Sequence, residues 1–268
     1  MSSQFIALAS CLDGFDAVKA DSARSFGRHT HDQFGIGLLC RGAQHSASGR
    51  GPVEARAGDV ITVNPGEVHD GRPIGDGGRA WRMLYLDPAI VAQAGLAITE
   101  GRPASFELTL PVARQPLLAR DLSELFGLVT GRAEPDTALR GEELLLSVLA
   151  RLCERAALRR EPPPPVQCAL HRMDDDPAVP VTLQELATLA GLSRFQLLRA
   201  FRQYTGLTPH AYLLQRRVQL ARRLIRRGMP LSQASAEAGF ADQSHMHRIF
   251  ARSFGLTPGA YAQAAVRS

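Results

Sequence analysis

The sequence has few cysteines and no long apolar run. Its four cysteines (Cys11, Cys40, Cys153 and Cys168) are scattered, and none forms a C-x-x-C pair. This spacing argues against a disulfide framework and against a zinc site built from cysteines. The longest strongly apolar stretch is 144–150, far short of the ~18–20 residues that cross a bilayer. With no secretory pattern at the start, we expect a cytoplasmic protein without a membrane segment.

Basic residues are few in the first part of the chain and in excess in the second. Residues 1–165 carry 18 Lys and Arg against 20 Asp and Glu, a net charge of −2. Residues 166–268 carry 13 against 6, a net charge of +7. A basic second part suits contact with a polyanion such as DNA, although a solvated basic face has the same charge.

A run of prolines divides the chain. Four prolines follow Glu161, and proline fixes φ and lacks an N–H group, so we expect an extended linker over 161–165. The linker separates a domain of residues 1–160 from a domain of residues 166–268. In the first, short apolar runs between Gly, Pro and Asp predict antiparallel strands, and apolar spacing predicts helices over 115–130 and 137–158. The strand ranges are 34–40, 53–56, 59–64, 81–86 and 106–110.

The second domain contains an internal repeat. Ala190-Gly191-Leu192 recurs 48 residues later as Ala238-Gly239-Phe240, and Gly206-Leu207-Thr208-Pro209 recurs 49 residues later as Gly255-Leu256-Thr257-Pro258. The change from 48 to 49 places one extra residue in the second turn. A repeat of this length indicates two copies of one supersecondary unit.

Each copy has the pattern of a helix, a tight turn and a second helix. In the first copy, Thr182 and Glu185 form a capping-box pattern before a helix over 183–189, Gly191 ends it, and Ser193 caps the next. Phe195, Leu198 and Phe201 predict the buried stripe of that next helix. In the second copy, a helix from Leu231 or Ser232 ends at Gly239, and Asp242 caps its successor. Residues 210–227 predict one connecting helix.

Such units place their second helix in the major groove of DNA, where Arg reads guanine and Gln reads adenine. Residues 166–268 resemble the DNA-binding domain of the AraC/XylS family of bacterial transcription regulators, through 183–187, 190–195, 236–240 and 254–258. The resemblance implies seven helices and two recognition helices in successive major-groove segments, ~34 Å apart. The expected DNA-binding residues are Ser193, Arg194, Phe195, Gln196, Arg199, Gln243, Ser244, His245 and Arg248.

Several of these assignments have alternatives. Phe195 either faces DNA or belongs to the core. Arg199 and Arg248 contact either bases or phosphates, and His245 either reads a base or lies at the surface. The paired arginines over 216–227 span too much of the helix circumference for all to face DNA.

The first domain contains His29-Thr30-His31 and a later Gly58-Asp59 strand that leads to Asn64-Pro65-Gly66 and His69. Alternate residues of a strand share a face, so His29 and His31 point the same way. This pattern resembles a cupin barrel, which implies an α+β protein with a cupin-like antiparallel β-barrel and two helices before the all-α domain. Metal-binding cupins carry Glu about five residues after His-x-His, where this chain has Ile36. We therefore expect no metal and no cofactor.

The barrel mouth is the expected site of a small-molecule effector. His29, His31, His69 and Arg82 are the candidate ligand-binding residues, although the histidines are alternatively structural. Trp81 and Tyr85 either line the pocket or fill the core. The leucine stripe of 137–158 packs either on the barrel or, as we expect, on a second copy in a homodimer.

The sequence therefore predicts a ligand-responsive transcription regulator that binds double-stranded DNA and a small-molecule effector, with no enzymatic activity. RNA polymerase is a further partner that the resemblance implies. The alternative is a cupin metalloenzyme fused to a DNA-binding domain. Metal content at His29, His31 and His69 discriminates the two.

Overall fold

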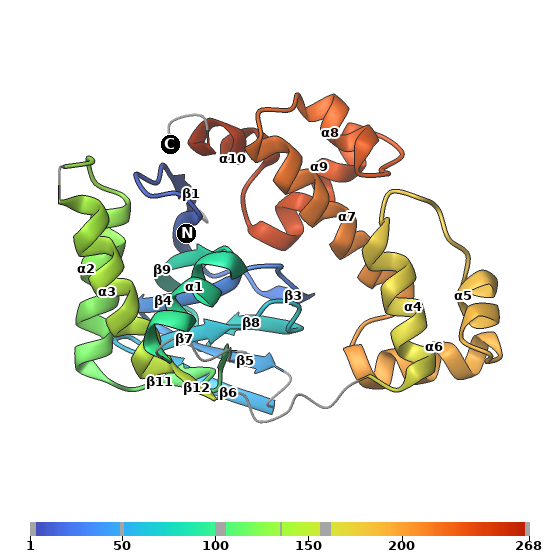
Figure 1. Cartoon of the computed structure of the whole chain (residues 1–268), viewed down its shortest axis with the longest axis horizontal. Helices are drawn as coiled ribbons and strands as arrows, with labels where there is room; N and C mark the ends of the chain where they lie inside the picture. The colour runs from blue at the N-terminus through green and yellow to red at the C-terminus, as the bar shows by residue number, and fades with distance from the viewer. Residues whose placement is uncertain (1–3, 49–50, 100–105, 135, 156–161, 266–268) are drawn as a thin grey trace. The chain divides into compact units, whose positions relative to one another are not determined.

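The computed structural model describes residues 4–48, 51–99, 106–134, 136–155 and 162–265. The chain forms two compact units (Figure 1). The first, Met1–Leu158 with Gln263–Ser268, is called the β-rich unit below, and the second, Arg159–Ala262, the helical unit. This is the α+β, two-part architecture that the sequence predicts.

A six-stranded antiparallel sheet organises the β-rich unit. Its strands run in the order β1 (Gln4–Leu8), β2 (Phe15–Ser22), β9 (Arg79–Leu86), β4 (Phe34–Arg41), β7 (Val60–Val63) and β11 (Val112–Ala113). Because directly paired residues share a face, Ile36 of β4 lies with Leu84 of β9, while Gly35 lies with Tyr85 on the opposite face. The two faces of this sheet therefore have different roles.

A second sheet has four strands in the order β3 (Phe26–His29), β8 (His69–Pro73), β5 (Ala43–Ser48) and β6 (Gly51–Arg56), and a ribbon pairs β10 (Phe106–Leu108) with β12 (Cys153–Arg155). The strand pairs of the described residues do not join these sheets into a closed barrel, but the antiparallel β-rich architecture is as predicted. Gly42 lies at one of the places where the chain passes from one sheet to the other, between β4 and β5. Its φ of +76° and a Cβ position 2.3 Å from the Gly78 carbonyl oxygen require glycine at this bend.

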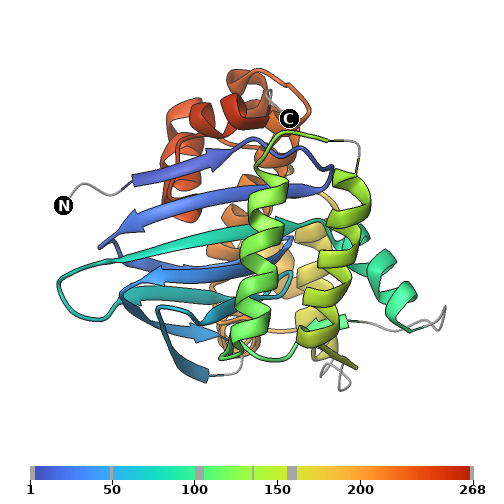
Figure 2. The same cartoon turned by 90° about the vertical axis from the view of Figure 1, so that its left-hand side faces the viewer.

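Helices α2 (Pro116–Val129) and α3 (Thr137–Leu152) pack side by side over one face of the six-stranded sheet (Figure 2). Leu118, Leu122, Leu145 and Leu149 bury their side chains against that face. The leucine stripe of α3 thus packs on its own domain, which corrects the expectation that this stripe contacts a second copy. The helix ends at Leu152 rather than near residue 158, since 153–155 form β12 and 156–160 lie outside the described residues.

Helix α1 (Pro88–Ile98) was missed by the sequence argument. Its composition is apolar without a clear polar face, so periodicity gave no signal. The local signal was Asp87-Pro88, because proline favours the first turn of a helix.

The helical unit contains seven helices among the described residues, as the family resemblance implies. They are α4 (Pro164–Asp175), α5 (Leu183–Leu189), α6 (Arg194–Thr205), α7 (Pro209–Arg226), α8 (Leu231–Glu237), α9 (Gln243–Phe254) and α10 (Pro258–Ala265). Val166, Met173, Leu186, Leu197 and Phe201 form the core of the first half. Met246 and Phe250 are fully buried in the second half.

Helix α4 begins at Pro164, so two of the four prolines belong to a helix and not to the expected linker. The first N–H groups of a helix have no intrahelical partner, so proline costs little there. The carbonyl of Pro163 accepts hydrogen bonds from Val166 N at 2.8 Å and Gln167 N at 3.0 Å. Glu161 lies outside the described residues. Among the described helices, none has the length and apolarity to cross a membrane.

Candidate DNA-binding surface and effector site

The two helix–turn–helix units have the same turn. Gly191 and Gly239 both adopt positive φ, at +64° and +76°. The next residue then donates to a carbonyl five residues back, Leu192 N to Ala187 O at 3.0 Å and Phe240 N to Ser235 O at 3.1 Å. Both turns are therefore Schellman motifs, which only glycine enters without strain. The repeat in the sequence is a repeat of this turn.

Side-chain caps begin the two recognition helices, α6 and α9. Ser193 Oγ accepts from Gln196 N at 3.2 Å, and Asp242 Oδ1 accepts from His245 N at 2.7 Å. Ser193 follows Leu192 directly, whereas Ala241 separates Phe240 from Asp242. Ala241 is thus the extra residue that the repeat spacing predicted.

The Gly-Leu-Thr-Pro repeat ends each recognition helix and starts the next helix. Gly206 and Gly255 terminate α6 and α9 with φ of +74° and +76°. Thr208 Oγ1 then accepts from Ala211 N at 3.2 Å, and Thr257 Oγ1 from Ala260 N at 3.1 Å. In each copy, glycine ends the recognition helix, threonine caps the next helix, and proline occupies the first position of that helix.

The structure exposes nearly all of the predicted DNA-binding side chains, and His245 is half-buried against the Phe240 ring. Within the described part of the chain, Arg194, Arg199 and Arg248 form no ion pair, so their guanidinium groups are available for DNA. The exposed set is Ser193, Arg194, Phe195, Gln196, Arg199, Gln243, Ser244 and Arg248.

Phe195 corrects the predicted buried stripe of α6. Its side chain is 73% exposed, whereas Leu197 and Phe201 are fully buried. Leu197 and Phe201 lie on the face of the helix that packs into the core. Phe195 lies on another face, in the first turn, which is the part of a recognition helix that meets base edges. A large exposed ring at that position favours the DNA-facing alternative.

Gln196 has a second role. Its Oε1 accepts from Ser193 N at 2.9 Å, which closes a capping box. Bidentate adenine recognition needs both the oxygen and the nitrogen of the amide. The Gln196 oxygen has a second lone pair and its NH₂ group has two donors, so the cap leaves groups for adenine. Gln196 and Gln243, the first residue of α9, are both exposed.

Several arginines of α7 serve the helical unit itself. Arg216 pairs with Asp174 of α4 at 2.8 Å, and Arg217 Nε donates to Pro177 O at 2.8 Å. Arg222 is buried, with its guanidinium 5.8 Å from the centre of the Phe254 ring. These three side chains hold α7 against its neighbours, which agrees with the expectation that not all of them face DNA.

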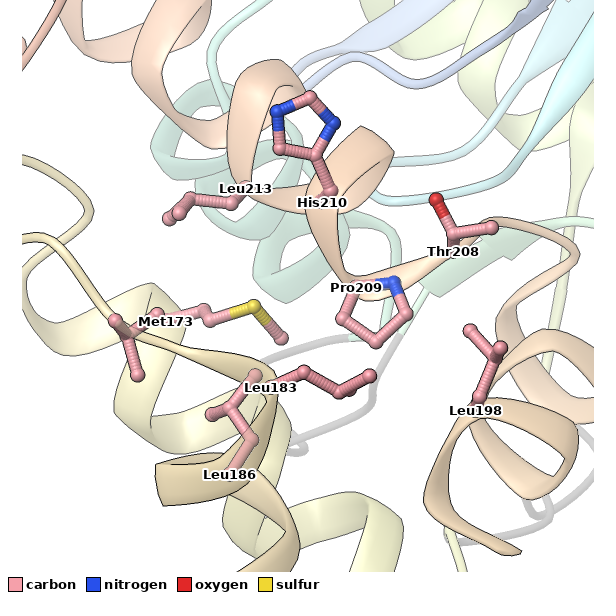
Figure 3. A pocket seen from close by; sticks show the side chains of 9 residues that line it. Met173, Leu183, Leu186, Leu198, Thr208, Pro209, His210 and Leu213 are labelled. Atoms are coloured by element: carbon pink, nitrogen blue, oxygen red, sulfur yellow. The ribbon is translucent and has the colours of Figure 1, made fainter. Parts of the chain in front are cut away.

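A cavity of about 250 Å³ lies between α4, α5, α6 and α7 (Figure 3). Leu198 of α6 and Pro209 of α7 line it, together with Met173, Val181, Leu183, Leu186, Thr208, His210 and Leu213. Its lining is mostly apolar. Helix α6 therefore packs less completely through Leu198 than through Leu197 and Phe201.

In the β-rich unit, the structure brings His29, His31 and His69 together. His29 of β3 and His69 of β8 are directly paired across the sheet. Their ring centroids are 4.3 Å apart, and the His31 ring lies 4.9 Å from His29 and 5.1 Å from His69. Tyr85 of β9 adds a ring 5.1 Å from His31. The sequence predicted this grouping from strand parity and the cupin-like spacing, but β3 ends at His29, so His31 does not lie on the strand that the parity argument assumed.

Backbone carbonyls fix two of the three rings. His29 Nδ1 lies 2.8 Å from Gly27 O, and His69 Nδ1 lies 3.0 Å from Glu67 O. A carbonyl only accepts, so Nδ1 carries the proton and Nε2 has a lone pair in each neutral ring. Burial and the neighbouring His69 lower the pKa of His29 to about 3, and burial lowers the pKa of His69. Both rings are therefore neutral at pH 7.

Arg82 does not join the histidines. Strand positions alternate between faces, and Tyr85, which contacts His31, shares a face with positions 79, 81 and 83 of β9. Arg82 lies on the other face, with its guanidinium 5.7 Å from the centre of the Phe126 ring of α2. This placement corrects the expectation that Arg82 binds the effector together with the three histidines.

Arg79 is the arginine of the histidine face, and the sequence argument missed it. It is 1% exposed and donates to Gln44 Oε1 at 2.8 Å and to Arg24 O at 3.0 Å. Its guanidinium lies 4.8 Å from the Trp81 ring centre, and burial lowers its pKa to about 10. Arg79 and Trp81 are two residues apart on one strand and therefore share a face, which is the signal in the sequence that could have identified Arg79.

The fold and these two sites define a DNA-binding regulator with a separate ligand-binding domain. Residues 14–149 match the family model of the AraC-like ligand binding domain, and residues 186–264 match that of a helix-turn-helix domain. An uncharacterized HTH-type transcriptional regulator of Bacillus subtilis, YbfI, is 31% identical over 229 residues, which cover 83% of this chain and 82% of that protein. The chain belongs to the AraC family of transcription regulators.

Two further likenesses have the same extent. The HTH-type transcriptional activator RhaR of Shigella dysenteriae is 24% identical over 87% of this chain and 86% of its own. The crystal structure of ToxT from Vibrio cholerae matches with a TM-score of 0.57 at 10% identity, over 100% of this chain and 98% of that chain. The second comparison supports the fold alone.

Proposed function

We propose that this regulator reads DNA with the first two turns of α6 and α9 and responds to a small-molecule effector in the β-rich unit. The observation that carries the DNA-binding part is the pair of Schellman turns, each followed by a capped, exposed and basic helix. Family membership supports the division into a ligand-binding and a DNA-binding domain.

Arg199 and Arg248 are the proposed base-reading arginines. Each lies one turn or more into its recognition helix, is exposed and forms no ion pair among the described residues. An arginine in this position reaches guanine O6 and N7 with two donors. Ser193, Arg194, Phe195, Gln196, Gln243, Ser244 and His245 complete the proposed DNA-contact set.

Binding sites selected from random DNA by the full-length protein test this assignment. We expect a bipartite motif with its parts about one helical turn apart. Arg199→Ala and Arg248→Ala each lower affinity for that motif by ~1–3 kcal/mol and relax the preference at one base position. Arg132→Ala, an exposed arginine after α2, is the control with the same change in net charge. If both variants weaken binding to every sequence equally, the two arginines are phosphate contacts.

The effector regulates DNA binding only if it binds two states of the protein with different affinity. We assign its site to the face that carries His29, His31 and His69. The same selection repeated with a metabolite pool tests this part. A pool-dependent change of affinity or motif supports it, and an unchanged result with every pool contradicts it.

The remaining proposed partners are a second copy of the chain and RNA polymerase. Two copies provide four recognition helices, and linked binding raises the effective affinity. Because the leucine stripe of α3 is covered, the dimer contact has to use other residues, such as the exposed Leu117 and Leu139. Sedimentation of the wild type and of Leu139→Ser tests this surface. Binding to chromosomal DNA supports a cytoplasmic location.

A further inference from the structure

The three histidines form a cluster of one ligand type. One nitrogen from each of His29, His31 and His69 lies within 4.8 Å of the others, and two of the side chains are fully buried. Nitrogen ligands at ~2.0–2.1 Å from a tetrahedral metal lie ~3.4 Å apart. Ring movements of about 1 Å are therefore enough to place all three nitrogens around one ion.

The hydrogen bonds of the cluster favour metal ligation. The Nδ1 atoms of His29 and His69 donate to Gly27 O and Glu67 O, so each Nε2 keeps its lone pair. In metal sites a histidine that binds through one nitrogen commonly donates the other N–H to a backbone carbonyl, which orients the ring.

We propose that His29, His31 and His69 bind one divalent transition-metal ion, with the remaining coordination positions left to water or to the effector. This inference rests on the proposed role of the β-rich unit as the sensor. Three imidazoles suit Zn²⁺, Fe²⁺, Co²⁺ or Ni²⁺, whereas Mg²⁺ and Ca²⁺ need oxygen ligands.

The sequence argument against a metal relied on Ile36, and the structure removes that argument. Ile36 packs into the apolar core on the helix-covered face of β4. A glutamate there would point away from the histidines. The residue of β4 that shares a face with Tyr85 is Gly35, and a Cβ at Gly35 would lie 2.7 Å from Met83 Cε and 3.5 Å from the Tyr85 ring. Glycine leaves the ion three protein ligands, the number found in sites with an open position.

Co²⁺ and Zn²⁺ are the probes. The full-length protein is stripped with chelator, and calorimetry measures binding of each ion alone, with the visible absorption of Co²⁺ as a second readout. We expect one ion per chain and Co²⁺ bands of a site with nitrogen ligands. Binding of less than one ion per chain with no such bands, in protein that remains folded, overturns the proposal.

Two variants locate the site. His31→Gln and His69→Gln weaken Co²⁺ binding by about 10-fold or more, while His45→Gln leaves it unchanged. His45 is the matched control, because it belongs to the same unit but pairs with Glu54 at 3.3 Å. Circular dichroism confirms that each variant is folded. Equal Co²⁺ binding by all three variants overturns the assignment, and the wild-type stoichiometry decides it if a variant fails to fold.

DNA binding, measured on the same samples, separates the two proposals. Protein that binds its selected DNA site but no metal contradicts the metal site and leaves the proposed function intact. Protein that binds one metal ion but no DNA, with or without metal, supports the site and contradicts the proposed function.

Discussion

At the residue scale, local polar contacts were predictable and distant ones were not. Thr182, Ser193 and Asp242 cap helices as predicted, because each partner lies three residues away in the sequence. The partners of Asp121 could not be predicted in that way. This buried carboxylate of α2 accepts from Arg120 at 2.9 Å and from Ser147 of α3 at 3.0 Å, and Arg151 lies 3.7 Å away.

Asp121→Asn removes the charge that joins α2 to α3. The hydrogen bond from Arg120, with help from Ser147, holds the pKa of Asp121 below its ordinary value. The ionised Asp121 side chain therefore stabilises the fold above pH ~4, the pKa of Asp in the unfolded chain. This stabilisation is lost as the pH falls through the pKa of Asp121 in the folded protein. We expect the variant to lose about 1–3 kcal/mol in unfolding free energy at pH 7, and the difference from wild type to shrink below pH ~4.

Denaturant unfolding at a series of pH values checks this prediction. Asp13→Asn is the control, because Asp13 is exposed. A difference between Asp121→Asn and wild type that stays constant down to the lowest pH contradicts the assigned role of the charge.

At the element scale, the repeated turns were the most predictable part of the fold, since glycine at a fixed spacing is a strong local signal. The strands were less so. β4, β7 and β9 were found from their apolar runs, but β2 and β8 were missed, because polar residues occupy much of both strands. The grouping of the three histidines was predicted. The arginine beside them was not, because the sequence does not reveal which face of β9 carries the histidine site: Arg79 lies on that face and Arg82 on the opposite one.

The two turn glycines differ in surroundings and therefore in tolerance. A Cβ at Gly191 meets nothing within 4 Å, whereas a Cβ at Gly239 lies 2.5 Å from the Ala178 carbonyl oxygen. We expect Gly191→Ala to cost ~1–2 kcal/mol from the positive φ alone, and Gly239→Ala to cost more because backbone must also move. Hydrogen exchange of the full-length protein measures both, over α5–α6 and over α8–α9. Equal effects of the two substitutions would contradict the close approach to Ala178.

At the scale of the whole molecule, the order of a strand-rich part before a helical part was predicted from composition and periodicity. The start of α4 was not predicted, because a run of prolines favours an extended chain, whereas Pro164 and Pro165 form the first turn of this helix. The pairing of the strands into separate sheets was not predicted either, because it joins strands that are distant in the sequence, such as β2 with β9.

A fragment of residues 162–268 tests the domain boundary. It contains residues 162–262 of the helical unit, including Pro163, whose carbonyl accepts from Val166 N and Gln167 N. We expect this fragment to fold and to bind DNA more weakly than the full chain, because the proposed dimer gives the full chain avidity. A fragment of residues 166–268 lacks that carbonyl and unfolds at a lower temperature. Thermal circular dichroism compares them, and an unfolded 162–268 fragment contradicts the boundary.

The only tryptophan of the chain is Trp81, which lies in the β-rich unit with its ring centroid 5.8 Å from Phe5 and 6.3 Å from Phe26. Phe26 in turn lies 6.1 Å from the ring of His29. Tryptophan fluorescence of the intact regulator on DNA, excited selectively over tyrosine, therefore reports on the β-rich unit alone. A change at the histidine face reaches the indole through one intervening ring, so the emission spectrum provides a label-free screen for effectors.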